Sequence, residues 1–368
     1  MNSANQDNVN RLIRPAFIAS DRLVEQQAYF LEHLLIGLAD ESIAVGLVCS
    51  ENAEMDSMGA MSVDLIHYPE LQIPFAGSYN LRKLLLRLEK FKPTVLHCLC
   101  EQRSGLVRQI SRELNIPYIQ SVNRLQSKGF GLSLSQKRCM RLVAPSKIIA
   151  DNIAKIYPRL AGRISHINMG TFIGQTSWCF SDPNKLASVI TADSSGESNE
   201  FDVLLDAVHN LAIEGYEFML VMIISEKNES RIRNQLNKMG LAHLVTILPG
   251  GSQWKQVLDA GDIFVQPRQV ETFNWIALEA MSVGTTVAAC KGGVDDIFID
   301  GQTAIIFDPD DELSVRTTLK KLLDQNDFAR QLAKKAQQYV RENHSVSKMV
   351  AGMLEVYEAA PVDFGQLA

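Results

Sequence analysis

Two glutamates separated by seven residues carry the clearest chemical signal in the sequence. Glu271 lies in a polar loop after an apolar run at 263–266, and Glu279 lies in an otherwise apolar segment at 275–283. A buried carboxylate needs hydrogen-bond donors, and a ribose diol offers two hydroxyl donors. Glu279 is therefore a candidate ligand of a ribose; the alternative is that it pairs with a lysine or caps a neighbouring loop.

A helix start lies between these glutamates. The run at 263–265 is typical of a strand that ends at Pro267, and helical sequence begins near Asn274. The first backbone N–H groups of a helix have no partner within the helix, so they form an anion site suited to a phosphate. The loop and the helix start are thus a candidate phosphate site.

Short apolar runs alternate with helix-length amphipathic segments, and these elements must position the candidate site. Leu81, Leu84, Leu85 and Leu88 show the helical spacing. Strands that alternate with helices predict parallel sheets with helices on both faces. The expected strands are 15–19, 43–49, 94–100, 118–121, 142–144, 186–190, 219–224, 245–248, 263–266, 286–289 and 304–307.

The chain has 368 residues, more than one hydrophobic core usually fills, so we expect two domains of roughly 150–200 residues. Glycines and a proline interrupt the pattern near 168–182. We therefore predict an α/β protein of two facing Rossmann-like, doubly wound domains. They comprise residues 1–170, joined by a C-terminal helix at 346–368, and residues 171–345. The interdomain cleft is the expected ligand site.

Motifs around the glutamates follow the pattern of a known family. AMSVGTTV (280–287) follows Glu279, and ACKGGVDDI (289–297), DGQTAIIF (300–307) and DPDD (308–311) come next. In the first half, KPTVLH (92–97), RLVAPSKIIA (141–150) and INMG (167–170) match mainly in pattern. The sequence resembles the family-four (group 1) retaining glycosyltransferases of the GT-B fold. The resemblance implies sugar transfer from a nucleotide-diphosphate donor with retention, with no metal and no cofactor besides the donor substrate.

The resemblance also implies roles for individual residues. Glu279 would hold the ribose hydroxyls of the donor, and Glu271 would face its sugar. Backbone amides would hold the phosphate, and two glycines would let the backbone approach the pocket; the alternative for the glycines is that they close a turn. These donor-binding positions are Phe273, Asn274, Trp275, Gly292 and Gly293. Asp296 stands where the family usually has a glutamate, and a local structural role is expected for it.

The diphosphate site departs from the family pattern. Members carry an arginine and a lysine after the first strand of the second domain, whereas residues 190–202 here contain neither. Losing two charge-assisted hydrogen bonds weakens diphosphate binding by about 3–6 kcal/mol, or two to four orders of magnitude. The family's Gly-Gly loop also reads SDRLVEQQ (20–27) here. Arg103 and Lys128 are candidate replacements from the first domain.

Two residues of the first domain are candidate catalytic groups beside Glu271. Asn123 stands where the family has an acceptor-side histidine; it can hydrogen-bond a sugar hydroxyl but cannot exchange a proton near pH 7. His97 closes a predicted strand. The alternative for His97 is a buried structural histidine.

Charge and cysteine content limit the remaining partners. Residues 1–180 hold 20 basic and 15 acidic side chains, and residues 181–368 hold 16 and 27. The basic helix at 81–92 could contact an anionic membrane or steer a phosphorylated acceptor; the alternative is a solvated helix face. No interleaved aromatic and basic residues indicate nucleic-acid binding. The six cysteines are scattered without metal-ligand spacing. With no apolar signal-peptide core at the start, we expect a cytoplasmic protein, with the inner membrane face as an alternative location.

The sequence thus predicts a retaining glycosyltransferase of polysaccharide, glycolipid or glycoprotein assembly, acting on a glycan, lipid-linked or protein acceptor. The altered phosphate site leaves a second hypothesis open: a catalytically silent relative that binds a sugar, a nucleotide or a partner protein as a scaffold or regulator. A third, a nucleotide-sugar epimerase with the same fold, also needs a good diphosphate site and is the weakest.

Overall fold

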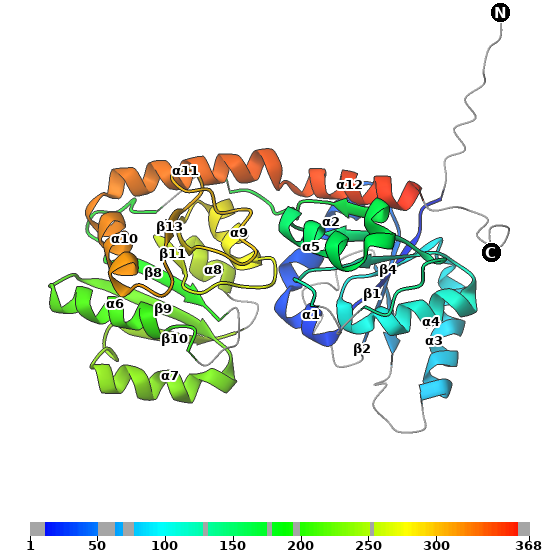
Figure 1. Cartoon of the computed structure of the whole chain (residues 1–368), viewed down its shortest axis with the longest axis horizontal. Helices are drawn as coiled ribbons and strands as arrows, with labels where there is room; N and C mark the ends of the chain where they lie inside the picture. Colours follow the sequence, from blue (N-terminus) through cyan, green and yellow to red (C-terminus); the bar gives the residue numbers. More distant parts are fainter. Residues whose placement is uncertain are drawn as a thin grey trace, which may run out of the picture.

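The computed structural model describes residues 12–50, 63–68, 77–127, 132–174, 179–193, 199–250 and 254–359. Two lobes lie side by side, each built on a parallel sheet with helices on both faces (Figure 1). This confirms the predicted α/β class with two Rossmann-like domains.

The first sheet has seven strands in the order β3-β2-β1-β4-β5-β6-β7. The strand order reverses between β1 and β4, which pair directly. Loops at the carboxyl ends of these two strands therefore face the ligand crevice. The strands are β1 (Pro15–Ile18), β2 (Val45–Ser50), β3 (Val63–Tyr68), β4 (Val95–Cys98), β5 (Tyr118–Ser121), β6 (Cys139–Ala144) and β7 (Ile164–His166).

The second sheet has six strands in the order β10-β9-β8-β11-β12-β13, and every pair is parallel. Its order reverses between β8 and β11, so the loop after β11 that carries Glu271 leaves the sheet at this point. The strands are β8 (Ala187–Ala192), β9 (Phe218–Ile224), β10 (Val245–Pro249), β11 (Ile263–Gln266), β12 (Thr286–Cys290) and β13 (Ile305–Phe307).

Helices connect the strands and cover both sheets. In the first domain they are α1 (Asp21–Gln26), α2 (Ala28–Asp40), α3 (Gly77–Phe91), α4 (Ser104–Leu114) and α5 (Lys147–Ile156), with 3₁₀ turns η1 (Glu101–Arg103) and η2 (Pro158–Arg163). In the second they are α6 (Asp202–Ile213), α7 (Glu226–Met239), α8 (Trp254–Asp259), α9 (Trp275–Val283), α10 (Glu312–Asp324) and α11 (Asn326–Asn343). α12 (Val346–Glu358) follows α11.

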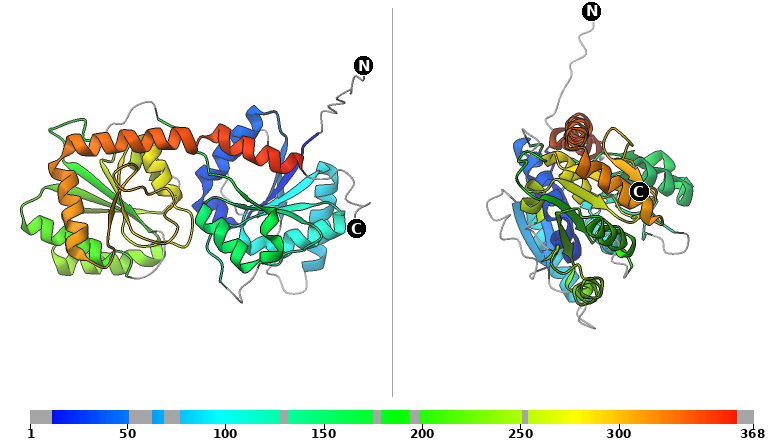
Figure 2. Two further views of the ribbon diagram at one scale, coloured as in Figure 1. Left: turned by 45° about the horizontal axis from the view of Figure 1, so that its top comes forward. Right: turned by 90° about the vertical axis from the view of Figure 1, so that its left-hand side faces the viewer.

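The last helix returns to the first domain. α11 lies along the second lobe, and α12 continues from it across the first (Figure 2). α12 packs closely on α2 because Gly37 has no side chain: a Cβ there would lie 2.5 Å from Val350. This is the arrangement expected for the start of the 346–368 segment, of which residues 360–368 lie outside the described part of the chain.

Two strands were not predicted from the sequence, β3 and β7. Both lie at edges of the first sheet. β3 exposes the side chains of Asp64 and Leu65, and β7 has only three residues, none of them buried. A strand without a continuous buried face lacks the apolar run that marks an interior strand of a parallel sheet.

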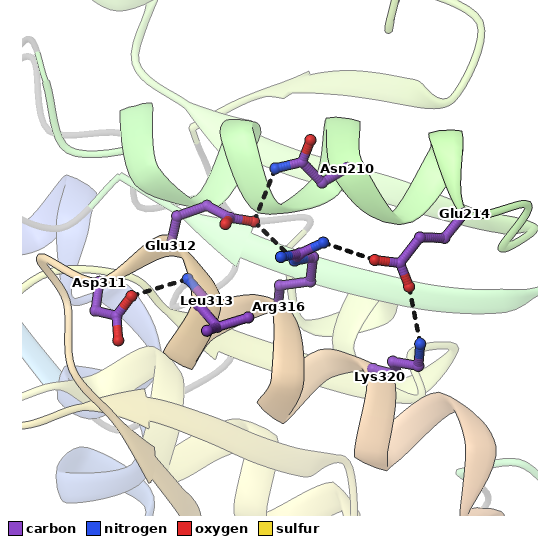
Figure 3. Close-up of polar contacts among 7 residues, drawn as sticks. All are labelled: Asn210, Glu214, Asp311, Glu312, Leu313, Arg316 and Lys320. Atoms are coloured by element: carbon purple, nitrogen blue, oxygen red, sulfur yellow. Dashed lines mark hydrogen bonds and ion pairs between the residues drawn. The ribbon is translucent and has the colours of Figure 1, made fainter.

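A chain of ion pairs joins α6 to α10 on the second domain (Figure 3). Arg316 lies between Glu214 at 2.6 Å and Glu312 at 3.1 Å, and Lys320 Nζ lies 2.8 Å from the second oxygen of Glu214. Asn210 donates to Glu312. Each charged group in this network has an opposite charge beside it and remains partly open to solvent.

Candidate functional site

The loop after β11 and the start of α9 form the centre of the candidate site. Asn274 caps α9, because its side-chain oxygen accepts from the Ala277 N–H at 3.0 Å. Gly284 ends the helix with φ of 83°, a conformation that favours glycine. The sequence correctly located this helix start. One of its N–H groups, that of Ala277, is already hydrogen-bonded to the Asn274 side chain.

Glu279 is buried between the two domains, with 3% of its surface exposed. Its Oε1 lies 3.5 Å from Nδ1 of His33 on α2, and its Oε2 lies 3.8 Å from Nζ of Lys255 on α8. Oε2 makes no hydrogen bond to any residue that the structure describes. Burial raises the pKa of Glu279 to about 7. The buried carboxyl thus keeps an unused acceptor at the domain interface, and the lysine is nearby as the alternative interpretation foresaw.

The His33 ring is held in one orientation. It hydrogen-bonds the backbone of Gly170, and burial lowers its pKa to about 4, so the ring is neutral near pH 7. Its Nδ1 has no hydrogen-bond partner in the described part of the chain. His33 therefore presents a neutral ring to Glu279 and does not neutralise it.

Trp275 packs between the domains at the first position of α9. Its ring centroid lies 4.4 Å from that of Phe30 on α2 and 5.0 Å from that of Phe273. Its indole Nε1 is buried and donates to none of the described residues. A buried unpaired donor and a buried unpaired acceptor, on Trp275 and Glu279, thus lie four positions apart on one helix.

A short backbone ladder crosses the domain interface beside this helix. Arg124 and Thr272 form an antiparallel bridge. The N–H of Leu125 donates to the carbonyl of Glu271 at 2.7 Å, and the N–H of Phe273 donates to the carbonyl of Asn123 at 3.1 Å. The Phe273 amide, expected to hold phosphate, is therefore engaged by the first domain in this structure.

Glu271 lies at the same crossing. Its Oε2 accepts from Nη2 of Arg124 at 2.8 Å, with 66% of the Glu271 side chain and 49% of the Arg124 side chain exposed. The carboxylate expected to face the donor sugar thus faces an arginine of the first domain, and water reaches both groups.

Asn123 lies at the domain interface, and its side chain faces inward. Its Nδ2 donates to the carbonyl of Leu99 at 2.8 Å, and its N–H donates to the carboxylate of Glu101 at 2.6 Å. The side chain is buried, with Oδ1 unpaired among the described residues. These contacts fix the loop that carries Arg124.

His97 lies in the core of the first domain. It is fully buried on β4, with Nδ1 2.8 Å from the Tyr357 hydroxyl and Nε2 2.8 Å from Ser121 Oγ. Burial lowers its pKa to about 3. A histidine with both nitrogens paired and no exposed surface cannot reach a substrate, so the geometry favours the structural alternative over the catalytic hypothesis.

Gly292 and Gly293 support the loop that carries Glu271. Both have positive φ, and a Cβ on Gly293 would lie 2.5 Å from the carbonyl of Val270. The Val294 N–H donates to that carbonyl. The glycines therefore lie in a turn that packs against this loop, but the turn leads from β12 to β13 and not to a helix, unlike the strand-to-helix turn of their alternative interpretation.

Asp296 hydrogen-bonds to the other domain rather than within its own loop. Its carboxylate accepts from Ser146 Oγ at 2.6 Å and from the N–H of Ile148 at 3.1 Å, at the start of α5. The expectation of a purely local role was wrong, because the partners of Asp296 belong to the other domain.

The unusual loop after β8 begins with a carboxylate that accepts two hydrogen bonds. Asp193 Oδ2 accepts from Ser225 Oγ and from Asn228 Nδ2, both at 2.8 Å. Residues 194–198 and Lys128 lie outside the described residues, and Arg103 ends η1, after β4. A carboxylate, Asp193, thus stands near the position at which the family pattern has a basic side chain.

Arg124 and His33 are the site residues that sequence reasoning missed. Each lies in the first domain and contacts a carboxylate that is more than 140 residues away in the sequence. A signal existed for Arg124 alone, since it directly follows Asn123, which the family pattern places beside the acceptor.

The basic helix α3 buries a leucine stripe, as its ordinary interpretation predicted. Leu84 and Leu88 are buried, while Tyr79 and Leu86 are exposed among basic side chains.

Within the described ranges, no helix combines the length and the apolar character needed to cross a bilayer, and no group of three or more potential metal ligands occurs.

Residues 184–339 match the family described as glycosyl transferases group 1. Among curated proteins, the chain is 29% identical over 159 residues to a sulfoquinovosyl transferase of Arabidopsis thaliana, covering 39% of this chain and 31% of that protein. It is 32% identical over 130 residues to a D-inositol 3-phosphate glycosyltransferase of Salinispora arenicola, covering 34% and 29%. The matched segments span about a third of these relatives.

Solved structures match over nearly the whole chain. A glycosyltransferase of Rickettsia africae superposes with a TM-score of 0.76 at 13% identity, covering 94% of this chain and 98% of that one. Anabaena HepE in complex with UDP-glucose gives 0.76 at 14% identity, covering 94% and 100%. At these identities the likeness establishes the fold. Together, the comparisons show the two-domain GT-B fold for the whole chain and a match of its second domain, at residues 184–339, to the group 1 glycosyltransferases.

Proposed function

We propose that this chain binds a nucleotide-diphosphate sugar in the cleft and transfers the sugar, with retention, to a hydroxyl of a glycan, lipid-linked or protein acceptor. Oε2 of buried Glu279, which accepts no hydrogen bond from any described residue and lies 3.8 Å from Lys255 Nζ, carries the proposal. A ribose diol supplies the donors that the protein does not. The solved relative that holds UDP-glucose supports the same donor class.

The residues around Glu279 have distinct tasks under this proposal. Glu279 accepts from the ribose hydroxyls as a carboxylate, and α9 directs its first amides at the phosphate. Glu271, exposed at the cleft, faces the donor sugar and its hydroxyls. Trp275 Nε1 is a further donor available to the ligand.

A second function, a catalytically silent binding or regulatory protein, is favoured by the cross-cleft contacts. The Phe273 amide and the Glu271 carboxylate are both engaged by the first domain. Under this alternative the cleft stays closed, and the domain pair acts as a scaffold for a sugar, a nucleotide or a partner protein.

Thermal-shift titration with UDP, GDP, ADP and their sugars tests the proposal. A ligand that binds only the folded state raises the melting temperature by mass action. We expect one base to give a shift and its nucleotide sugar to release free nucleotide faster when candidate acceptors are added. A chain that shows no shift with any of these compounds at millimolar concentration is instead the silent relative.

The exposed face of α3 supports a membrane-associated location at the inner face of a bilayer. Arg82 and Lys83 flank exposed Tyr79 and Leu86, a mixture that suits an anionic interface. Co-sedimentation with vesicles that contain anionic lipid should exceed that with neutral vesicles and fall in high salt. Equal sedimentation with both would remove this location.

A further inference from the structure

The second domain lacks a cation at the start of its donor loop. No lysine or arginine occurs at 190–202, and Asp193, directly after β8, is held by Ser225 and Asn228. A diphosphate carries at least two negative charges, which helix amides alone neutralise only in part. If a donor binds here, a cation must come from another part of the chain.

The first domain places an arginine beside the helix start. The bridge between Arg124 and Thr272 puts the Arg124 backbone opposite a residue two positions before Asn274, the cap of α9. The flanking hydrogen bonds from Leu125 and Phe273 fix this register. Asn123 is anchored in turn by the Leu99 carbonyl and by Glu101. Arg124 is therefore held at the entrance of the phosphate site by its own backbone.

The present partner of the guanidinium is weakly held. Glu271 pairs with Arg124 at 2.8 Å, but about two thirds of the Glu271 side chain is exposed to water. Exposed pairs contribute roughly 0–1 kcal/mol. A diphosphate offers a guanidinium more charge and bidentate geometry, so it can displace this carboxylate.

We propose that Arg124 is the diphosphate-binding cation of this chain, supplied across the cleft by the first domain, and that Glu271 occupies it until the donor enters. The assignment rests on the proposed function. It replaces the missing clamp with one residue from the opposite domain, so the backbone bridge that joins the two domains also positions the cation for the diphosphate. The released Glu271 carboxylate is then available to the donor sugar.

Binding of a nucleoside diphosphate, compared with its nucleoside, tests this assignment by calorimetry. The nucleoside and its diphosphate carry the base whose nucleotide raises the melting temperature of the wild-type protein. Arg124→Ala should weaken diphosphate binding by about 10- to 150-fold, the effect of one charge-assisted bond, and leave the nucleoside unchanged. Glu271→Gln should strengthen diphosphate binding by about two- to fivefold, because it frees the guanidinium.

The control is Arg112→Ala. Arg112 is also in the first domain and pairs with Glu113 at 2.8 Å, with 68% of its side chain exposed, but lies on α4. Arg112→Ala should change the affinity for neither the nucleoside diphosphate nor the nucleoside. Equal losses in Arg124→Ala and Glu271→Gln would assign the pair a purely structural role and overturn the assignment. Undiminished diphosphate binding by Arg124→Ala overturns it while sparing the proposed function; no binding by the wild type overturns both.

Discussion

Two carboxylates on the second domain show what separates a stabilising charge from a ligand-binding one. Glu214 lies on the outer surface and is shared by Arg316 and Lys320 (Figure 3). The hydrogen bond from Lys320 lowers the pKa of Glu214. Glu279 lies at the cleft, where burial raises its pKa to about 7 and one oxygen has no hydrogen bond among the described residues.

The difference lies in what completes each site. Around Glu214 the protein supplies the opposite charges itself, so no further molecule is needed. Around Glu279 the nearest cation is 3.8 Å away and His33 is neutral. A group buried without full compensation lowers stability, and such groups gather where a ligand binds.

The largest expected effect separates these two carboxylates directly. Glu279→Ala removes two hydrogen bonds that the ribose hydroxyls donate to a charged acceptor, about 3–6 kcal/mol in all. Nucleotide affinity measured by calorimetry should fall by about two to four orders of magnitude. Glu214→Ala, the matched control, should leave affinity unchanged. Similar affinities for the two variants would place the ribose elsewhere.

His97 sharpens the comparison with a buried group that the protein does complete. His97→Ala leaves the Tyr357 hydroxyl and Ser121 Oγ unpaired and opens a cavity. We expect about 2–5 kcal/mol lower stability in urea unfolding. Nucleotide affinity of the folded fraction should stay as in the wild type. A stable variant that loses only transfer activity would restore the catalytic hypothesis for His97.

The raised pKa of Glu279 predicts pH-dependent nucleoside binding. Burial favours the neutral carboxyl, so the folded pKa of about 7 exceeds the ordinary glutamate value of 4.5. Stability from this group is complete below pH 4.5 and is lost as pH rises through 7. A ribose needs the carboxylate, so nucleoside affinity should rise about tenfold between about pH 6 and 8. His33, with its pKa near 4, stays neutral throughout.

Glu279→Gln is the control for this pH dependence. The amide cannot titrate, so affinity should no longer rise between about pH 6 and 8, and stability should no longer fall between pH 4.5 and 7. Persistence of the tenfold rise in this variant would assign the titration to a different group.

The smallest expected effect belongs to the outer network. Arg316→Met removes the charge shared by Glu214 and Glu312 but keeps a long apolar side chain. Partly exposed pairs contribute little, so the melting temperature should fall by less than about 4 °C, and by less still in high salt. A larger, salt-independent fall would show that this network is part of the domain core.

Sequence patterns predicted the interior of both sheets well. Every expected strand exists, because interior parallel strands are buried on both faces and appear as short apolar runs. β3 and β7 were not predicted because polar residues such as Asp64 and His166 interrupt or shorten their apolar runs, whereas β10, also an edge strand, keeps an apolar run at 245–248. The candidate site was predicted in part. Glu279 and the start of α9 follow from local sequence, whereas the contacts of Arg124 and His33 depend on how two domains meet.

The helix that returns to the first lobe has a consequence for synthesis. Tyr357 completes the hydrogen bonding of His97, and Val346 and Val350 lie against Gly37. The first domain therefore lacks one of the helices that cover it until α12 has left the ribosome. Its folding ends only after the second lobe has been made, so the two halves mature together although each has its own sheet.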